Sequence, residues 1–112
     1  MKIAFTSSGR TWDSIIDPRF GRTAFIVTYD EESQEFDVVD NSAAQNHAHG
    51  AGTATAQKIY EILPQVLITG NGPGETASKA LIHAKMKIFI NAHNLTLQQA
   101  YDQYKLGKLE KI

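Results

Sequence analysis

The first 40 residues alternate hydrophobic and polar side chains, as half-buried β-strands do. This pattern predicts three strands, over residues 2–6, 23–29 and 35–40. A short polar turn, residues 30–34, separates the second and third strands, so these two are expected to pair as a hairpin. The start of the chain is therefore predicted to be an antiparallel meander.

After residue 50 the pattern alternates between helical and strand-like. A helix is predicted over about residues 50–63, where apolar positions follow the i, i+3, i+4, i+7 spacing and Pro64 ends the pattern. Short apolar runs at 65–69 and 87–90 predict two buried strands. Between them lies a second helix, whose apolar face is formed by four residues: Ala77, Ala80, Leu81 and Ala84.

A third amphipathic helix is predicted after the last of these strands. Thr96 and Gln99 fit a capping box, in which each side chain accepts a hydrogen bond from the other residue's backbone N–H. Leu97, Ala100, Tyr101 and Tyr104 form the apolar face. The helix is expected to end near Gly107.

The predicted element order is β-β-β-α-β-α-β-α, which indicates a single α/β domain over residues 1–112. Strands joined through helices make right-handed crossovers and run parallel, so we expect a mixed five-stranded sheet in a three-layer α/β/α arrangement. Eight apolar strand residues are expected to be largely buried: Ile3, Phe5, Phe25, Val27, Val66, Ile68, Ile88 and Ile90.

This topology brings four loops to one edge of the sheet, because the strands that precede them all point the same way. In open α/β sheets, ligands bind beyond the carboxyl ends of the strands where the strand order reverses. The predicted edge collects Asp17, Arg19, Phe20 and Arg22, then His47 and His49, then residues 70–74, then Asn91 and His93. The fourth histidine, His83, falls inside the second helix.

The composition narrows the class of protein. A net charge of −1 argues against a dedicated nucleic-acid binder. No run approaches the roughly 18 apolar residues of a transmembrane helix, and the start of the chain does not read as a signal peptide, so we expect a cytoplasmic protein without a membrane partner. The chain has no cysteine, which excludes disulfides, thiolate nucleophiles and a cysteine-ligated iron–sulfur site.

Each candidate residue at the edge can be interpreted either as a structural residue or as a binding residue. His47 and His49 precede a helix N-terminus, where they are either solvated loop residues or metal ligands. The segment 70–74 is either a tight turn or a backbone cradle. Arg19 and Arg22 are either anion-binding charges or salt-bridge partners of Asp17. His93, a single histidine in its loop, is interpreted as a structural residue.

Two segments at this edge, residues 7–22 and 41–49, are polar and show no periodic apolar face. Such loops open at low free energy when they have few buried contacts. We therefore expect both segments to be mobile and to become ordered when a ligand binds.

Several short motifs together resemble the nitrogenase iron–molybdenum cofactor biosynthesis accessory family. They are Lys2-Ile-Ala-Phe, Asp17-Pro-Arg-Phe-Gly-Arg, Asn41 with the downstream His49-Gly-Ala-Gly, Leu67-Ile-Thr-Gly, and Thr96-x3-Ala in the last helix. The resemblance spans nearly the whole chain. The chain is similar to the small stand-alone members of that family. His47 is a departure from the usual pattern.

The resemblance implies a ribonuclease-H-like fold and a non-catalytic role: binding or carrying an iron–sulfur or iron–molybdenum cofactor precursor. It also implies cofactor-assembly proteins as partners. The implied cofactor-binding residues are Arg19, Phe20, Arg22, Gly50, Gly52, Gly70 and Gly72, and the implied metal ligands are His49 and His47.

Three hypotheses follow for the function. The first is a carrier of a metal cluster, and the second is a module that binds a small anion or phosphometabolite without metal. The third is a nuclease-like enzyme, which needs a carboxylate cluster for divalent metals. The edge offers mainly Asp13, Asp17 and Glu75 for that purpose, so the third ranks lowest.

Overall fold

The computed structural model describes residues 1–45 and 50–112 and contains one six-stranded sheet in the order β3-β2-β1-β4-β5-β6. The strands are β1 (Lys2–Ser7), β2 (Phe25–Asp30), β3 (Glu35–Asp40), β4 (Val66–Ile68), β5 (Lys87–Ile90) and β6 (Glu110–Lys111). The pairs β1–β2, β2–β3 and β5–β6 are antiparallel, whereas β4 runs parallel to both β1 and β5. The mixed sheet and its leading meander are therefore confirmed.

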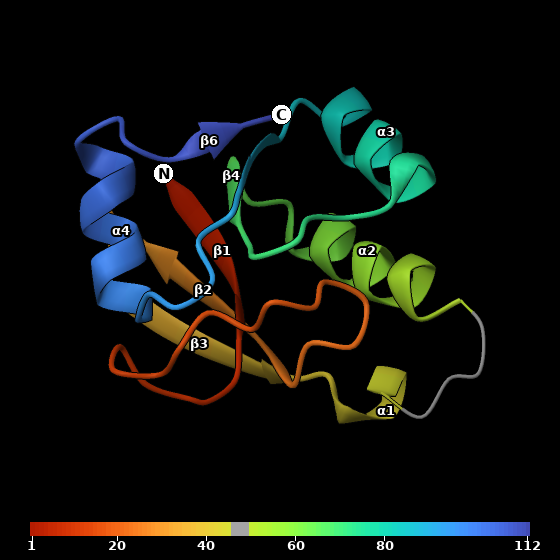
Figure 1. Cartoon of the computed structure of the whole chain (residues 1–112), viewed down its shortest axis with the longest axis horizontal. Coiled ribbons are helices and arrows are strands. Elements are labelled where there is room, and N and C mark those ends of the chain that lie inside the picture. The colour runs from red at the N-terminus through yellow and green to blue at the C-terminus, as the bar shows by residue number, and fades with distance from the viewer. Residues whose placement is uncertain (46–49) are drawn as a thin grey trace.

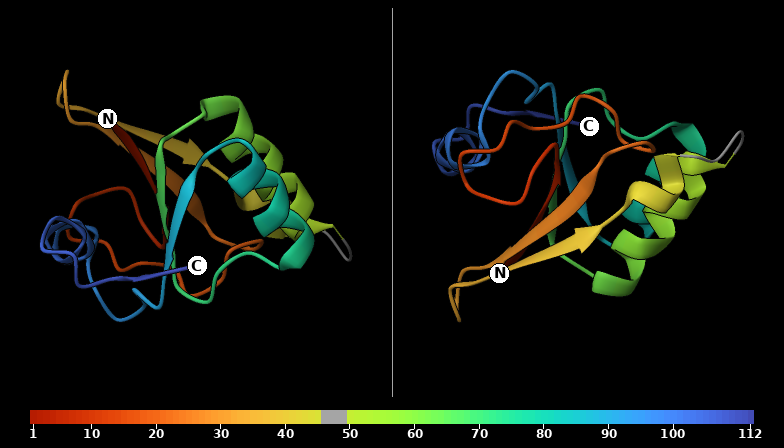
Figure 2. Two further views of the ribbon diagram at one scale, coloured as in Figure 1. Left: turned by 90° about the horizontal axis from the view of Figure 1, so that it is seen from above. Right: turned by 90° about the horizontal axis from the view of Figure 1, so that it is seen from below.

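The helices cover both faces of this sheet, as Figures 1 and 2 show. They are α1 (Ser42–Gln45), α2 (Ala51–Ile62), α3 (Glu75–His83) and α4 (Leu97–Lys105). One face packs against α4 through Ile3, Phe5 and Val27, and the other packs against α2 and α3 through Ala4, Ile26 and Leu67. The predicted three-layer arrangement is confirmed.

The helix boundaries follow from their caps. Thr96 and Gln99 form the predicted capping box, with both hydrogen bonds present. Gly50 precedes α2 with φ 79°, a left-handed conformation that glycine adopts without steric cost. Gly107, with φ 71°, ends α4 as expected.

The prediction of five strands is wrong. The sixth strand, β6, has only two residues, Glu110 and Lys111, which pair with Ile90 and Phe89 at the edge of the sheet. A two-residue strand carries no periodic pattern that a sequence could display. The short helix α1 was likewise predicted as part of a loop.

The burial of the strands matches the prediction at six of the eight residues. Phe25 and Ile90 are only half-buried. Both lie at strand ends that face the edge where the loops meet, and the Arg10 guanidinium lies 4.7 Å from the Phe25 ring centroid. Incomplete cover at the sheet margin explains the difference.

Residues 7–22 bury single side chains although the segment shows no periodic apolar face. Ile16 is fully buried in the core beneath α4, and its N–H donates to the Leu95 carbonyl at 2.8 Å. Trp12 packs edge-on against Phe5 and Tyr29. The anchoring residues do not recur with a helical or strand period, so no pattern revealed them.

One ion-pair network ties the β2–β3 turn to α4. Glu31 accepts hydrogen bonds from the Tyr101 hydroxyl and from Lys105 Nζ, the latter at 2.9 Å. The bond from Lys105, followed by that from Tyr101, lowers the pKa of Glu31. Among the described helices, none is long and apolar enough to cross a lipid bilayer.

Replacing Glu31 with Gln should lower the free energy of unfolding at pH 7 by about 1 kcal/mol. Because the folded pKa lies below the ordinary value of about 4.3, the unfolded chain takes up the proton first as the pH falls. The difference in unfolding free energy between wild type and variant should therefore be largest at pH 7 and decrease below about pH 4.3. Urea unfolding at several pH values measures this. Glu32→Gln, at a fully exposed neighbour, is the control, and a deficit that does not change with pH would contradict the assignment.

Candidate functional site

The carboxyl ends of β1, β3, β4 and β5 lie at one edge of the sheet, as the topology predicted. The chain turns from β1 toward β2 on one side and later returns to β4 on the other. The strand order therefore reverses beside β1, which is the position where open α/β sheets bind ligands. The loop that follows β1 crosses this position (Figure 1).

That loop touches both neighbouring elements through backbone atoms. A Cβ added at Gly21 would lie 2.7 Å from the backbone nitrogen of Gly52 in α2. A Cβ added at Gly70, just after β4, would lie 2.5 Å from the Cα of Pro18. The Asn71 N–H donates to the Pro18 carbonyl at 2.8 Å. Side chains at either glycine would push these backbones apart.

A buried carboxylate, that of Asp17, holds the loop in shape. Its Oδ1 accepts from the backbone N–H of Arg19 at 3.0 Å and from Arg19 Nε at 3.1 Å. Its Oδ2 accepts from Arg19 Nη2 at 3.2 Å and from the Ala24 N–H at 3.1 Å. Asp17 is 2% exposed, whereas the Arg19 side chain is 54% exposed. These hydrogen bonds and the charge of Asp17 raise the pKa of Arg19.

Two buried threonines, which no sequence pattern singled out, support the loop from below. Thr6 Oγ1 donates to the Asp17 carbonyl at 3.1 Å and shares a hydrogen bond of 2.7 Å with Thr69 Oγ1. Thr6 lies in β1, and Thr69 follows β4 directly. The sequence did carry a signal for both threonines, because each is a polar residue at the end of an apolar strand.

The Arg22 guanidinium bonds to a backbone carbonyl and not to Asp17. Its Nη1 donates to the Gln45 carbonyl at 2.8 Å, and Gln45 Nε2 donates back to the Arg22 carbonyl at 3.2 Å. Arg19 alone makes the predicted salt bridge with Asp17. Phe20 is 4% exposed and belongs to the core beneath α2, so it anchors the loop.

Several backbone N–H groups at this edge have no hydrogen-bond partner within residues 1–45 and 50–112. They include those of Phe20, Gly21 and Arg22 in the loop. The first turn of α2 supplies more, because the earliest intrahelical bond runs from the Ala54 N–H to the Gly50 carbonyl. The Gly21–Gly52 contact brings the two groups together, and unpaired N–H groups of this kind bind anions.

The predicted glycines differ in what surrounds them. Among the described residues, a Cβ added at Gly50 or Gly52 would meet nothing within 4 Å. Gly70 and Gly72 have packing reasons to be glycine, since Gly72 has φ 87° and a Cβ there would lie 2.9 Å from the Ile90 side chain. A cofactor role for any of these four stays a prediction.

Of the three histidines predicted for this edge, the structure describes one, His93. His47 and His49 lie outside the described residues. His93 is half-buried, and its Nδ1 is buried with no partner in the described part of the chain. Within that part, no group of three His, Asp or Glu side chains is placed to hold a metal ion.

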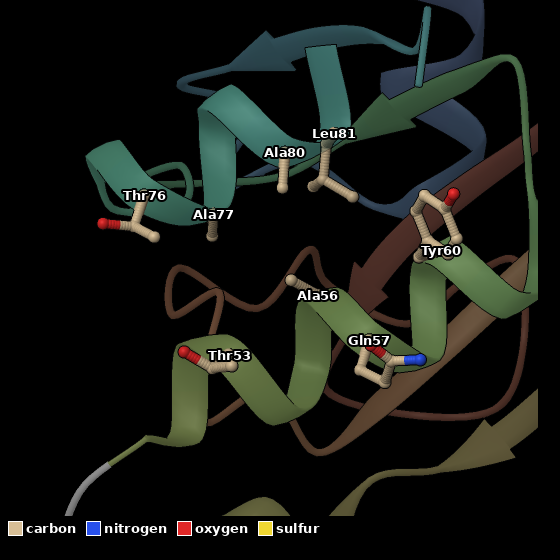
Figure 3. A pocket seen from close by; sticks show the side chains of 8 residues that line it. All are labelled: Thr53, Ala56, Gln57, Tyr60, Thr76, Ala77, Ala80 and Leu81. Atoms are coloured by element: carbon tan, nitrogen blue, oxygen red, sulfur yellow. The ribbon is translucent and has the colours of Figure 1, made fainter. Parts of the chain in front are cut away.

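An apolar cavity of about 140 Å³ lies elsewhere, between α2 and α3 (Figure 3). Thr53 and Thr76 lie at one end of it, and Tyr60 and Leu81 lie at the other. None of the residues predicted for the site lines this cavity. The cavity and the edge are therefore separate features.

Asp17→Asn should reduce the free energy of unfolding by about 2–3 kcal/mol, because an amide NH₂ would face N–H donors in a buried position. Chemical denaturation measures the change. Asp13→Asn is the matched control, since Asp13 is an exposed residue of the same loop, and it should stay within about 0.5 kcal/mol of the wild type. Equal stability of both variants would show that Asp17 does not hold the loop.

Comparison with known proteins gives a family and two similar structures. The family model for the dinitrogenase iron–molybdenum cofactor matches residues 1–107. Among curated proteins, none matches the chain. The apo form of the orange protein from Desulfovibrio gigas is 36% identical, with a TM-score of 0.91, over 99% of this chain and 92% of that one.

A Thermotoga protein, described as a candidate NifB protein and solved by NMR, is 31% identical with a TM-score of 0.81. The match covers 98% of this chain and 91% of that one. The family match agrees with the resemblance carried by the motifs at residues 17–22 and 49–52. The chain belongs to the dinitrogenase iron–molybdenum cofactor family.

Proposed function

We propose that the protein binds and carries an anionic iron–sulfur or iron–molybdenum-type cluster precursor without catalysing a reaction. The family match supports a cofactor-related role. We keep the ribonuclease-H-like class, a cytoplasmic location and cofactor-assembly partners as predictions that accompany this proposal. The nuclease-like alternative gains no support, because the Asp17 carboxylate is already held by Arg19 and Ala24.

The observation that carries the proposal is the contact of Gly21 with the first turn of α2. It places the N–H groups of residues 20–22, which have no partner among the described residues, beside those of the helix N-terminus, whose dipole favours negative charge. Neither Gly50 nor Gly52 fills the space in front of these groups with a side chain. An anionic cluster would be stabilised there by several backbone donors together.

Arg19 would add a positive charge at the same edge. Its Nε and Nη2 are held by Asp17, while Nη1 has no hydrogen bond within the described residues. The guanidinium is thus fixed in place and still half-exposed to an incoming anion. Arg22, which is bonded to Gln45, would contribute mainly by shaping the loop.

Histidine would supply the metal–ligand bonds in a chain that has no cysteine. His49 and His47 are the proposed ligands, and neutral imidazole binds iron and copper. An incomplete ligand set suits a carrier, because the cargo must leave again. The same amide groups would bind phosphate or a phosphometabolite equally well, and this is the alternative function.

The proposed ligand role of His49 predicts that His49→Ala fails to retain a cluster. The measurement is metal analysis and absorption spectroscopy after anaerobic incubation with iron, sulfide and molybdate. His83→Ala is the matched control, since His83 is an exposed residue at the end of α3, and it should load like the wild type. Full metal content in His49→Ala would contradict the ligand role. A wild type that loads no cluster would contradict the carrier function.

The proposed amide site predicts that Gly52→Glu weakens binding of phosphate or molybdate more than Gly52→Gln does. The two side chains have the same shape, so only the charge differs. A negative charge in the first turn should stabilise α2 by roughly 0.3–1 kcal/mol while it repels an anion. Titration of the amide signals of residues 20–22 and 51–53 measures binding, and thermal unfolding measures stability. Equal binding by both variants would place the anion elsewhere.

A further inference from the structure

We infer that Asn41 and Thr55 are positioning residues that orient the Gly21–Arg22 peptide toward the cargo. This inference rests on the proposed function, because it assigns these residues to the same site. Neither residue faces the edge. Both are fully buried behind it, where their side chains join β3, the loop after β1 and α2.

The contacts form one continuous chain. Lys58 Nζ donates to Asn41 Oδ1 at 2.9 Å. Asn41 Nδ2 donates to Thr55 Oγ1 at 2.9 Å and to the Thr23 carbonyl at 3.1 Å. Thr55 Oγ1 then donates to the Gly21 carbonyl at 2.7 Å. Three of these hydrogen bonds thus connect the Lys58 ammonium to the Gly21 carbonyl, and the fourth ties Asn41 to Thr23.

The direction of these bonds follows from the chemistry of the groups. An ammonium group can only donate, so the amide oxygen of Asn41 must face Lys58. Both amide hydrogens are then used on Thr23 and Thr55, and the Thr55 proton is left for Gly21. A chain of bonds that all point the same way is strengthened by mutual polarisation, and the charge of Lys58 adds to it.

The last bond determines where the Arg22 N–H points. The Gly21 carbonyl and the Arg22 N–H belong to one planar trans peptide, in which they point in opposite directions. Holding the carbonyl on the Thr55 hydroxyl therefore also fixes the direction of the Arg22 N–H. Glycine gives this peptide wide freedom to rotate, so a fixed hydrogen bond is needed to keep one orientation.

No other side chain of residues 1–45 and 50–112 makes a hydrogen bond to this peptide group. The side chain and carbonyl of Arg22 are bonded to Gln45, which fixes the residue after the peptide plane. Asp17 fixes the loop before it, through Arg19. The orientation of the peptide between them depends on Thr55, and the orientation of Thr55 depends on Asn41.

The test compares Thr55→Val, which has the same shape but no hydroxyl, with Thr55→Ser, which restores the hydroxyl. Thr28→Val is the control, because Thr28 is a buried threonine of β2 whose side chain makes no hydrogen bond within the described residues. Molybdate is the probe, and its dissociation constant is measured from amide shifts. Thr55→Val should bind molybdate roughly 10-fold more weakly, while Thr55→Ser and Thr28→Val should bind like the wild type.

A second measurement reports the peptide itself in the free protein. The residual dipolar coupling of the Arg22 N–H should change in Thr55→Val and return in Thr55→Ser. An unchanged coupling would overturn the inference whether or not the protein binds molybdate. A changed coupling with unchanged affinity would also overturn it, because the peptide would then lie outside the site.

Failure of the proposed function gives a different result. If the wild type binds neither molybdate nor a cluster, there is no cargo to position, and the inference falls together with the proposal. The dipolar couplings would still decide whether Thr55 orients the peptide. Loss of thermal stability with unchanged affinity would identify Thr55 as a structural residue only.

Discussion

The buried carboxylate of Asp17 is the constraint on which the candidate site depends. A buried charge is costly unless hydrogen bonds surround it, and Asp17 meets this condition with four donors from Arg19 and Ala24. Those donors lie on both sides of residues 20–23, so satisfying the charge closes the turn. The loop that a sequence pattern presents as open and polar is therefore folded around its own anion.

Once the turn is closed, small residues decide what it can touch. Gly21 and Gly70 let the loop approach α2 and the end of β4 at backbone distance, and Thr6 and Thr55 satisfy carbonyl groups that this approach buries. Larger side chains at the glycines would separate the layers, and apolar side chains at the threonines would leave buried acceptors unpaired. Packing and hydrogen bonding thus impose the same arrangement.

The sequence predicts those features that repeat or that follow local rules. Strand alternation, the Thr96 capping box and the direction of the strands were all visible, and together they locate the edge. The partner of Arg22 was not visible in the sequence. It is the Gln45 carbonyl, and every residue type carries the same backbone carbonyl. Ile16 and Phe20 were missed as anchors for a related reason: they pack as single side chains, with no period to detect.

A carrier must hold its cargo and also release it, and the arrangement at this edge suits both. Backbone N–H groups are neutral donors, so they stabilise an anion without forming a strong ion pair. The charge of Arg19 is largely offset by Asp17, which limits the attraction that it adds. In the proposed carrier role, the affinity supplied by the histidine ligands would therefore be supplemented by many weak donors held in a fixed geometry. Such a site loses affinity as soon as one segment shifts, whereas a cluster bonded to several cysteines would need each metal–sulfur bond to be replaced.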